Sequence, residues 1–213
     1  MIAPAIGHEE IEIVGAGPAG LTEGDVLDEI RSLGIEIDFE CRPVHACKFF
    51  DAEGRPYNVS SQKPLWYLVQ RGSQEGTIDQ ALKRQALAAG VEIKFSHSVK
   101  QLSRGGILTY GPRRSNVIAV GYVFETGAAD CAYGVMSEEL APGGYAYLLV
   151  CNGRGTLATC LFHSFHNEQE CLDRTLKFFQ ARTSVEIHNA RPFGGYGNFA
   201  IPPELRRKNF LLA

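Results

Sequence analysis

The sequence predicts a mixed α+β fold, in which an incomplete α/β layer is interleaved with an antiparallel β-sheet. Two observations lead to this prediction. Helical and strand-like patterns both occur in the first 95 residues, whereas residues 106–165 are rich in β-branched and aromatic residues, are punctuated by glycine and show no helical period. The length of 213 residues leaves room for one large domain or two small ones.

The α/β layer is predicted from two patterns that combine a strand with a helix. Residues 11–14 form a short apolar run, and a helical register over 21–33 follows a glycine-rich turn. Thr77 has a glutamine three residues later, which is a capping box, and Gly90 suits the position just after the end of this second helix. Residues 91–95 (VEIKF) are then predicted to form a strand.

The antiparallel sheet is predicted from several strand-like runs. Residues 35–44 alternate apolar and polar side chains, 48–59 contain two runs joined by a turn, and 64–69 are apolar. Further strands are expected within 106–165. A second capping box at Asn167 then begins a helix with an apolar stripe. The residues of this stripe are Leu172, Leu176 and Phe179.

Composition and charge exclude several classes of protein. Apolar residues make up 45% of the chain and charged residues 21%, which excludes collagen, coiled coil and disorder. A net charge of −3 provides no basic surface for nucleic acid, so no nucleic-acid partner is expected. The longest apolar run, residues 145–151, is too short to span a membrane, and residues 1–10 lack a signal-peptide pattern. A cytoplasmic location without a transmembrane segment is therefore expected.

The cysteines and histidines do not suggest a metal site or disulfides. No CxxC spacing occurs, so the six cysteines are expected to be reduced and to pack as small apolar residues. Cys160, His163 and His166 are close in sequence, but their odd spacing places successive groups on opposite faces of a strand. We therefore expect these three residues to be structural and predict no metal ligand.

A glycine-rich motif lies between the first predicted strand and the first predicted helix. Gly15 permits a tight turn, Gly17 lets the backbone approach a pyrophosphate, and Gly20 lets helix and strand pack closely. The N–H groups at the start of the helix attract phosphates. This context favours a Rossmann-like site for FAD or NAD(P) over a turn that binds nothing. The predicted cofactor-binding residues of the motif are Gly15, Ala16, Gly17, Pro18, Ala19 and Gly20.

Glu40 is a candidate ribose ligand. An acidic residue about 20 positions after the last glycine ordinarily binds a ribose hydroxyl of the dinucleotide, and Glu40 ends the alternating segment at that distance. Gly15 to Glu40 would then form the compact βαβ fingerprint of an NAD(P)-binding reductase. The helix between them is unusual for such a fingerprint, because its first turns are acidic and it lacks small residues that would let it lie close to a sheet.

Three motifs together resemble one known family. GAGPAGL at 15–21, Arg71 before the IDQAL segment at 78–82, and the PxGYxY pattern at 142–147 are similar to motifs of the FAD-dependent oxidoreductases related to geranylgeranyl reductases. These enzymes share the two-domain architecture of p-hydroxybenzoate hydroxylase. The resemblance covers nearly the whole chain from Glu10 onwards, and the combination is much more specific than GAGPAGL alone.

The resemblance implies a domain organisation, a cofactor and a reaction. The FAD-binding Rossmann-like part would consist of residues 1–34 and 72–115, and the antiparallel-sheet substrate domain of residues 35–71 and 116–213. Bound FAD, reduced by NAD(P)H or a ferredoxin, would transfer hydride to a small unsaturated, apolar or isoprenoid-like substrate. No titratable side chain stands out as a catalytic acid or base, so the catalytic residues and the oligomeric state stay open.

Three further residues receive roles from the resemblance. Arg71 lies where the family has an arginine near the flavin, and a guanidinium suits a phosphate or the reduced flavin ring; the alternative is a surface arginine. Tyr145 and Tyr147 alternate on one face of a strand, where the family lines its substrate cavity; the alternative is core packing. Residues 191–199, rich in glycine and aromatic residues, are expected to form a loop, with or without a ligand beside it.

The sequence departs from the family pattern in two places. Leu21 is joined directly to Thr22, where the family continues into an alanine-rich helix and a strand ending in the ribose-binding glutamate, so on this comparison Glu40 belongs to a substrate-domain strand. The family also follows a strand similar to 208–213 with a Gly-Asp or Gly-Glu motif that contacts the flavin, and this chain stops at Ala213. We therefore expect weak FAD binding, and a non-catalytic remnant of a flavoprotein is the alternative to an active reductase.

Overall fold

The structure is a computed structural model of the chain, and it describes residues 12–14, 26–97, 106–108, 115–197, 206–207 and 210–212. The chain divides into two compact units, each made of segments that are far apart in sequence. Unit 1 comprises Met1–Cys41, Val69–Gly111 and Pro202–Ala213, and unit 2 comprises Arg42–Leu68 and Pro112–Ile201.

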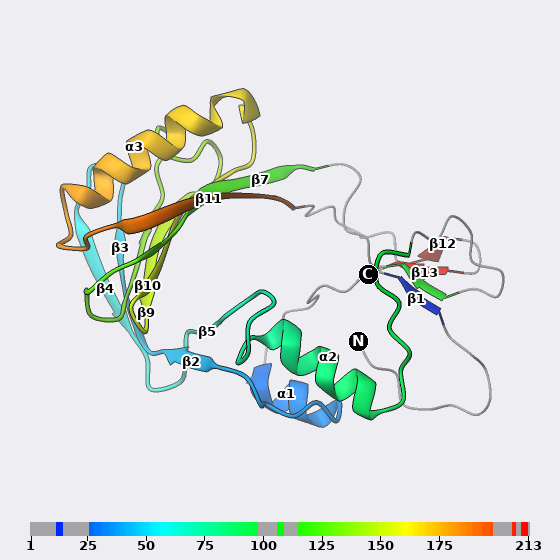
Figure 1. Cartoon of the computed structure of the whole chain (residues 1–213). Coiled ribbons are helices and arrows are strands. Elements are labelled where there is room, and N and C mark those ends of the chain that lie inside the picture. Colours follow the sequence, from blue (N-terminus) through cyan, green and yellow to red (C-terminus); the bar gives the residue numbers. More distant parts are fainter. Residues whose placement is uncertain are drawn as a thin grey trace. The chain divides into compact units, whose positions relative to one another are not determined.

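The described part of unit 1 contains a small sheet and two helices (Figure 1). Strand β6 lies between β1 and β13 and pairs in parallel with both, whereas β12 pairs antiparallel with β13. Parallel pairing is typical of an α/β layer. The elements are β1 (Glu12–Val14), α1 (Val26–Ser32), α2 (Ile78–Ala88), β6 (Gly106–Leu108), β12 (Arg206–Arg207) and β13 (Phe210–Leu212).

Helix α2 begins and ends as the sequence predicts. The Thr77 side chain at the N-cap accepts the N–H of Gln80 at 3.3 Å. Gly90 follows the C-cap residue with a φ of +84°, a left-handed conformation that glycine adopts at low cost. The strand expected at 91–95 is wrong, because the backbone there forms no strand. Phe95 instead places its ring 4.8 Å from Nζ of Lys83.

The strand expected over 35–44 begins only at Cys41, so the prediction is wrong for residues 35–40. β2 (Cys41–Val44) pairs with β5 (Trp66–Val69) in a two-stranded sheet. The chain passes from one unit to the other within these two strands.

Unit 2 is built on a seven-stranded sheet with the order β11-β7-β10-β9-β8-β3-β4. Neighbouring strands are antiparallel except β3 and β8, which pair in parallel over three residue pairs. The elements before α3 are β3 (Ala46–Phe50), β4 (Pro56–Ser60), β7 (Val117–Glu125), β8 (Cys131–Val135), β9 (Tyr145–Cys151), β10 (Arg154–Leu161) and the 3-10 turn η1 (Phe165–Asn167).

Helix α3 (Glu168–Gln180) lies across one face of this sheet (Figure 1). Leu172 and Phe179 are buried in one apolar core and Leu176 packs against it, as the sequence stripe predicts. Asn167 holds the predicted N-cap position, although its side chain makes no capping hydrogen bond. The sheet contributes Phe50, Phe124, Val135, Ala146, Leu148 and Leu157 to the same core.

The last strand of unit 2 corrects another expectation. Most of the segment expected to be a loop lies in β11 (His188–Gly197), which pairs antiparallel with β7 and has a bulge between His188 and Arg191. The mixed α+β fold class is confirmed. Within the described residues, no helix is long and apolar enough to cross a membrane. The assignment of cofactor and substrate to separate domains remains a prediction.

Candidate functional site

The first strand of unit 1 leads into the glycine motif. β1 ends at Val14, and it pairs in parallel with β6, with Glu12 opposite Gly106. Gly15 therefore follows the carboxyl end of a parallel strand, which is the end where open α/β sheets bind ligands. Residues 15–20 lie outside the described residues, so their cofactor contacts remain predictions.

Arg71 is fixed by the first turn of α2. Its Nε and Nη2 each donate to the Asp79 carboxylate at 2.8 Å, and the Gly72 N–H donates to the same carboxylate at 2.7 Å. The hydrogen bond from Arg71 lowers the pKa of Asp79, and the bond to Asp79 raises the pKa of Arg71. The structure thus joins the two parts of the sequence motif, the arginine and the helix that follows it.

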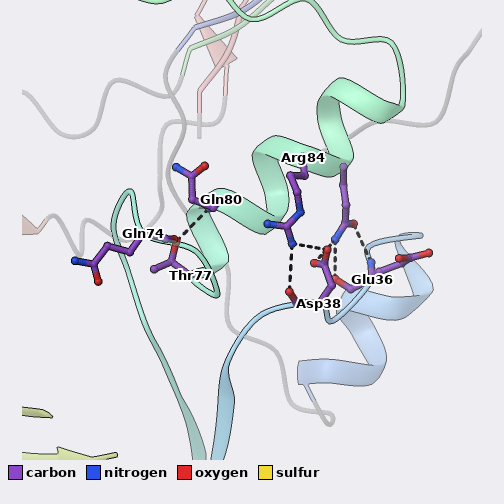
Figure 2. A network of polar contacts seen from close by, with 7 residues as sticks. Glu36, Asp38, Gln74, Thr77, Gln80 and Arg84 are labelled. Carbon is purple, nitrogen blue, oxygen red and sulfur yellow. Dashed lines mark hydrogen bonds and ion pairs between the residues drawn. The ribbon is translucent and has the colours of Figure 1, made fainter. Parts of the chain in front are cut away.

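Thr77 closes the loop between Arg71 and α2. Its side chain is fully buried, and its Oγ1 lies 2.8 Å from the carbonyl oxygens of both Gly72 and Gln74. The same oxygen accepts the Gln80 N–H (Figure 2). One buried hydroxyl therefore holds the loop to the helix, so the Arg71 side chain starts from a fixed backbone.

A second polar network holds residues 36–38 against α2 (Figure 2). The Gln85 side chain accepts the Glu36 N–H and donates to the Glu36 carbonyl, both at 2.9 Å, so it pairs with this residue as a neighbouring strand would. Arg84 Nη2 and Gln85 Nε2 each donate to the Asp38 carboxylate at 2.7 Å. The hydrogen bond from Arg84 lowers the pKa of Asp38. α2 therefore contacts both Arg71 and the 36–38 segment.

Glu40 does not end a strand beside β1. It precedes β2, and its N–H donates to the Gly76 carbonyl at 2.8 Å. Its carboxylate lies beside the same glycine, because a Cβ on Gly76 would be 3.5 Å from Glu40 Oε1. The compact NAD(P) fingerprint requires a strand that ends at Glu40, and residues 35–40 form none.

The face of the seven-stranded sheet opposite α3, which we call the open face, carries no helix in the described part of unit 2. On β9, Ala146 and Leu148 belong to the core under α3, so Tyr145 and Tyr147 project from the open face. The strand registers place the following residues on this face: Phe49, Ala119, Gly121, Val123, Gly134, Tyr145, Tyr147, Ala158, Cys160 and Phe193.

The two tyrosines predicted to bind substrate lie side by side on the open face. Their ring centroids are 6.3 Å apart, and Tyr145 is 45% exposed whereas Tyr147 is half-buried. Cys160 lies opposite Tyr145 on β10 and forms a hydrogen bond with it. Burial raises the pKa of Tyr147 to about 12 and raises the pKa of the Cys160 thiol. The cluster therefore carries neutral hydroxyl groups, and the buried Cys160 thiol lies beneath them.

Small residues form the middle of the open face, and aromatic rings lie over glycines at its sides. A Cβ on Gly121 would lie 2.8 Å from Cε1 of Phe193, and a Cβ on Gly134 would lie 2.7 Å from Cε1 of Phe49. Ala158 lies opposite Gly121 on the neighbouring strand. An apolar surface with a few neutral polar groups has the composition of a site for an apolar ligand.

The CLFHSFH segment does not gather its polar side chains at one point. Cys160 is buried within β10, whereas His163 and His166 lie beyond the end of this strand and are exposed. His163 Nε2 lies 3.0 Å from Glu138 Oε1. The described residues contain no group of three side chains that could hold a metal ion. No disulfide joins the six cysteines, of which three are buried.

Sequence reasoning did not find the residues that fix Arg71 and the 36–38 segment. Asp79 lies in the IDQAL segment at 78–82, one of the motifs that resemble the reductase family, but nothing in this motif identifies Asp79 as the partner of Arg71. Gln85 carries no motif at all. The short separation of Arg71 from an acidic residue in the first turn of a helix is the one signal that could have indicated the ion pair.

Comparison with protein-family models and with curated proteins gives no match. The fold is similar to solved structures. Over 86% of this chain it is similar to a geranylgeranyl bacteriochlorophyll reductase-like protein from Thermoplasma acidophilum, with a TM-score of 0.55 and 13% identity. Over 88% of the chain it is similar to the peptidyl tryptophan dihydroxylase QhpG, with a TM-score of 0.54 and 15% identity, and to FqzB, with a TM-score of 0.55 and 10% identity.

The chain spans about half the length of these structures: 57% of the first, 49% of the second and 54% of the third. At identities of 10 to 15% the likeness establishes a shared fold. The reaction is not established by a shared fold, because one fold hosts many chemistries.

Proposed function

We propose that this chain is an FAD-dependent oxidoreductase, similar to the geranylgeranyl reductases, that acts on a small apolar or isoprenoid-like substrate. FAD, reduced by NAD(P)H or a ferredoxin, supplies hydride transfer when it is bound. The observation that carries the proposal is the position of the glycine motif directly after β1 in a parallel sheet. The similar fold of a reductase-like protein supports it.

The residues of unit 1 fit a dinucleotide cofactor at two points. The Gly15-to-Gly20 motif follows, in sequence, the carboxyl end of a parallel strand, and in this proposal its N–H groups bind the pyrophosphate. Arg71 is held by two bonds to Asp79 through Nε and Nη2, which leaves Nη1 directed at no acceptor among the described residues. A guanidinium fixed in this way can donate to a phosphate or to the flavin without reorganising.

The open face of unit 2 supports an apolar substrate. Tyr145 is 45% exposed on this face, and its ring centroid lies 6.3 Å from that of Tyr147. Tyr147 stays protonated at neutral pH because burial raises its pKa to about 12. In this role the two tyrosines orient the substrate through ring contacts and neutral hydrogen bonds, and they carry no charge that would repel an apolar molecule.

Binding of FAD and ADP to the purified chain, measured by calorimetry, tests the proposal. Gly17→Val should abolish binding, because a side chain there fills the space of the pyrophosphate. Gly127→Val is the matched control, since a Cβ on Gly127 would meet no atom within 4 Å, and it should bind as the unaltered chain does. Equal affinity of Gly17→Val and the unaltered chain would overturn the glycine-motif assignment.

Glu40→Gln separates the flavin proposal from the compact NAD(P) fingerprint. Because Glu40 lies beside Gly76 and ends no strand, the substitution should leave nucleotide affinity within about twofold. If Glu40 binds a ribose hydroxyl, Glu40→Gln should lower the binding free energy by about 1.5 to 3 kcal/mol, the contribution of a charge-assisted hydrogen bond. That larger loss would favour the NAD(P)-binding reductase over the proposal made here.

A further inference from the structure

A serine lies at a sharp turn between a strand and a helix in unit 2. β10 ends at Leu161, η1 begins at Phe165 and continues into α3, and Ser164 stands just before η1. Ser164 has a φ of +57° and a ψ of +40°, a left-handed conformation that is uncommon for residues other than glycine. A serine on a strained strand-to-helix turn presents its hydroxyl outward, which is how several hydrolytic enzymes present their nucleophile.

The hydroxyl of Ser164 belongs to a relay of three side chains. His163 Nδ1 lies 3.0 Å from Ser164 Oγ, and His163 Nε2 lies 3.0 Å from Glu138 Oε1. With its hydrogen on Nε2, the imidazole donates to Glu138 and accepts the Ser164 hydroxyl at Nδ1. The order hydroxyl, imidazole, carboxylate is that of a nucleophile, its general base and the group that orients the base.

The backbone around Glu138 and His163 fixes this relay. Glu138 Oε2 accepts the Gly143 N–H at 3.0 Å, so both carboxylate oxygens are engaged. A Cβ on Gly143 would lie 2.9 Å from Cδ2 of His163, so only glycine leaves room for the imidazole in this position. Gly143 also has a φ of +66°, which glycine adopts at low cost.

Donors for a developing oxyanion lie next to Ser164. The Asn167 N–H is bonded to the Ser164 carbonyl at 3.0 Å, which closes the first turn. The first N–H groups of a helical segment have no partner inside it, and here they belong to Phe165 and His166. The N–H of the residue that follows a serine nucleophile at a helix start is a recurrent part of an oxyanion hole.

The surroundings indicate the kind of acyl group. Phe162, which is 38% exposed, precedes His163, and Met136, which is 68% exposed, is two residues before Glu138. The His163 side chain is 56% exposed and the Glu138 side chain 70%, so the relay is open to solvent and a substrate can approach it from the surface. A short apolar acyl chain suits these exposed apolar side chains, and an extended polar chain does not.

We propose that Ser164, His163 and Glu138 form an acyl-transfer site for esters of short apolar acids, independent of the proposed flavin chemistry. Ser164 Oγ attacks the acyl carbon while its proton passes to His163 Nδ1, and the ester C–O bond breaks as the leaving alcohol takes that proton. Water then attacks the acyl-serine ester, again losing a proton to His163. The carboxylic acid leaves and the Ser164 hydroxyl is restored, so the net reaction is ester hydrolysis without a redox step.

The test uses the full chain, p-nitrophenyl butyrate as substrate and an alkyl fluorophosphonate as a covalent probe. The probe should modify Ser164, as located by mass spectrometry of the digested chain. Ser164→Gly suits the backbone at φ +57°, and it should lower hydrolysis at least about tenfold. His163→Gln should lower it by a similar factor and also prevent labelling, since the hydroxyl then lacks its base.

Matched variants distinguish this relay from general surface reactivity. Ser137→Ala and Glu139→Gln alter the same residue types close by, and each should keep the rate of the unaltered chain. Circular dichroism melts of every variant separate loss of activity from loss of the fold. The proposal is overturned if no adduct forms at Ser164 in the unaltered chain, or if folded Ser164→Gly hydrolyses the ester as fast as that chain does.

Discussion

Different kinds of contact stabilise the two units internally. Among the side chains that the structure describes, almost all of the buried ones belong to unit 2, where α3 and the seven-stranded sheet share one apolar core. Of the side chains described in unit 1, only those of Phe39, Thr77 and Ala81 are buried. Helix α2 instead makes several polar contacts, among them the Arg71–Asp79 pair and the bonds of Arg84 and Gln85 to the 36–38 segment.

This difference matters because the two kinds of contact respond differently to solvent. Burial of apolar surface is insensitive to pH, whereas half-exposed ion pairs depend on the protonation of their carboxylates and on screening. Unit 1 carries the predicted cofactor motif, so its stability is the part that a bound dinucleotide would increase. Unit 2 should fold without that help.

The largest effect is expected in the core of unit 2. Phe179 is 1% exposed and its ring lies 6.4 Å from that of Phe50, so Phe179→Ala should lower the free energy of unfolding by about 3 to 5 kcal/mol. Urea unfolding followed by circular dichroism measures the change. Phe95→Ala is the control: this ring in unit 1 is 68% exposed, and its loss should cost less than about 1 kcal/mol. Similar losses of stability in Phe179→Ala and Phe95→Ala would contradict the conclusion that an apolar core stabilises mainly unit 2.

A smaller effect is expected when the Arg71 pair is broken. Asp79→Asn removes a charge that holds Arg71 and the Gly72 N–H. Because the side chains are 50% and 32% exposed, the pair is partly screened, and the loss should be roughly 1 to 2 kcal/mol. Hydrogen exchange should rise over residues 70–90 and stay unchanged in β9 and β10. Asp173→Asn on the surface of α3 is the matched control, and a rise in β9 would contradict the contrast.

Acid should affect unit 1 first. Hydrogen bonds from Arg71 and Arg84 lower the pKa values of Asp79 and Asp38, so these carboxylates stabilise the fold above the unfolded pKa, about 4, and lose that contribution as pH falls through their folded values. In unit 2, desolvation raises the pKa of Asp51, but hydrogen bonds from Arg55 outweigh it and lower the value; this pair lies in a turn outside the core.

Hydrogen exchange between about pH 5 and pH 3 shows which unit loses its stability first as the pH falls. After correction for the intrinsic pH dependence of exchange, protection should fall over residues 70–90 at a higher pH than in β9 and β10. Simultaneous loss in both regions would show that the polar contacts of unit 1 do not control its acid stability.

Local signals were predicted well from the sequence, because they depend on neighbours in the chain. The Thr77 cap involves a residue three positions away, and the stripe that includes Leu172 and Phe179 is set by the helical period. The open-face position of Tyr145 and Tyr147 follows from alternation along β9 in the same way. Their role toward a substrate is a separate matter and remains a proposal.

The strand predictions that failed depended on distant partners. Glu36 and Asp38 alternate with apolar residues as in a strand, but their segment pairs with side chains of α2. Gln85 binds the backbone of Glu36, and Arg84 binds the carboxylate of Asp38. A period of two shows which side each residue faces and does not show whether a sheet or a helix lies there. The prediction of a loop over residues 191–199 failed in the opposite sense. The glycines of this segment are typical of a loop, but most of the segment belongs to β11, which pairs with β7 at an edge of the sheet.

The smallest effect is expected on the open face. Burial, with smaller contributions from the neighbouring Cys160 and Tyr145, raises the pKa of Tyr147 to about 12. Its contribution to stability is therefore present below pH 10 and is lost only as pH rises toward 12. Tyr147→Phe should therefore change the free energy of unfolding at neutral pH by less than about 1 kcal/mol. An absorbance titration at alkaline pH should lose its last tyrosinate step in this variant. Tyr145→Phe, which is more exposed, should keep that step, and a Tyr147 that titrates near 10 would show that the open face is more hydrated than its burial indicates.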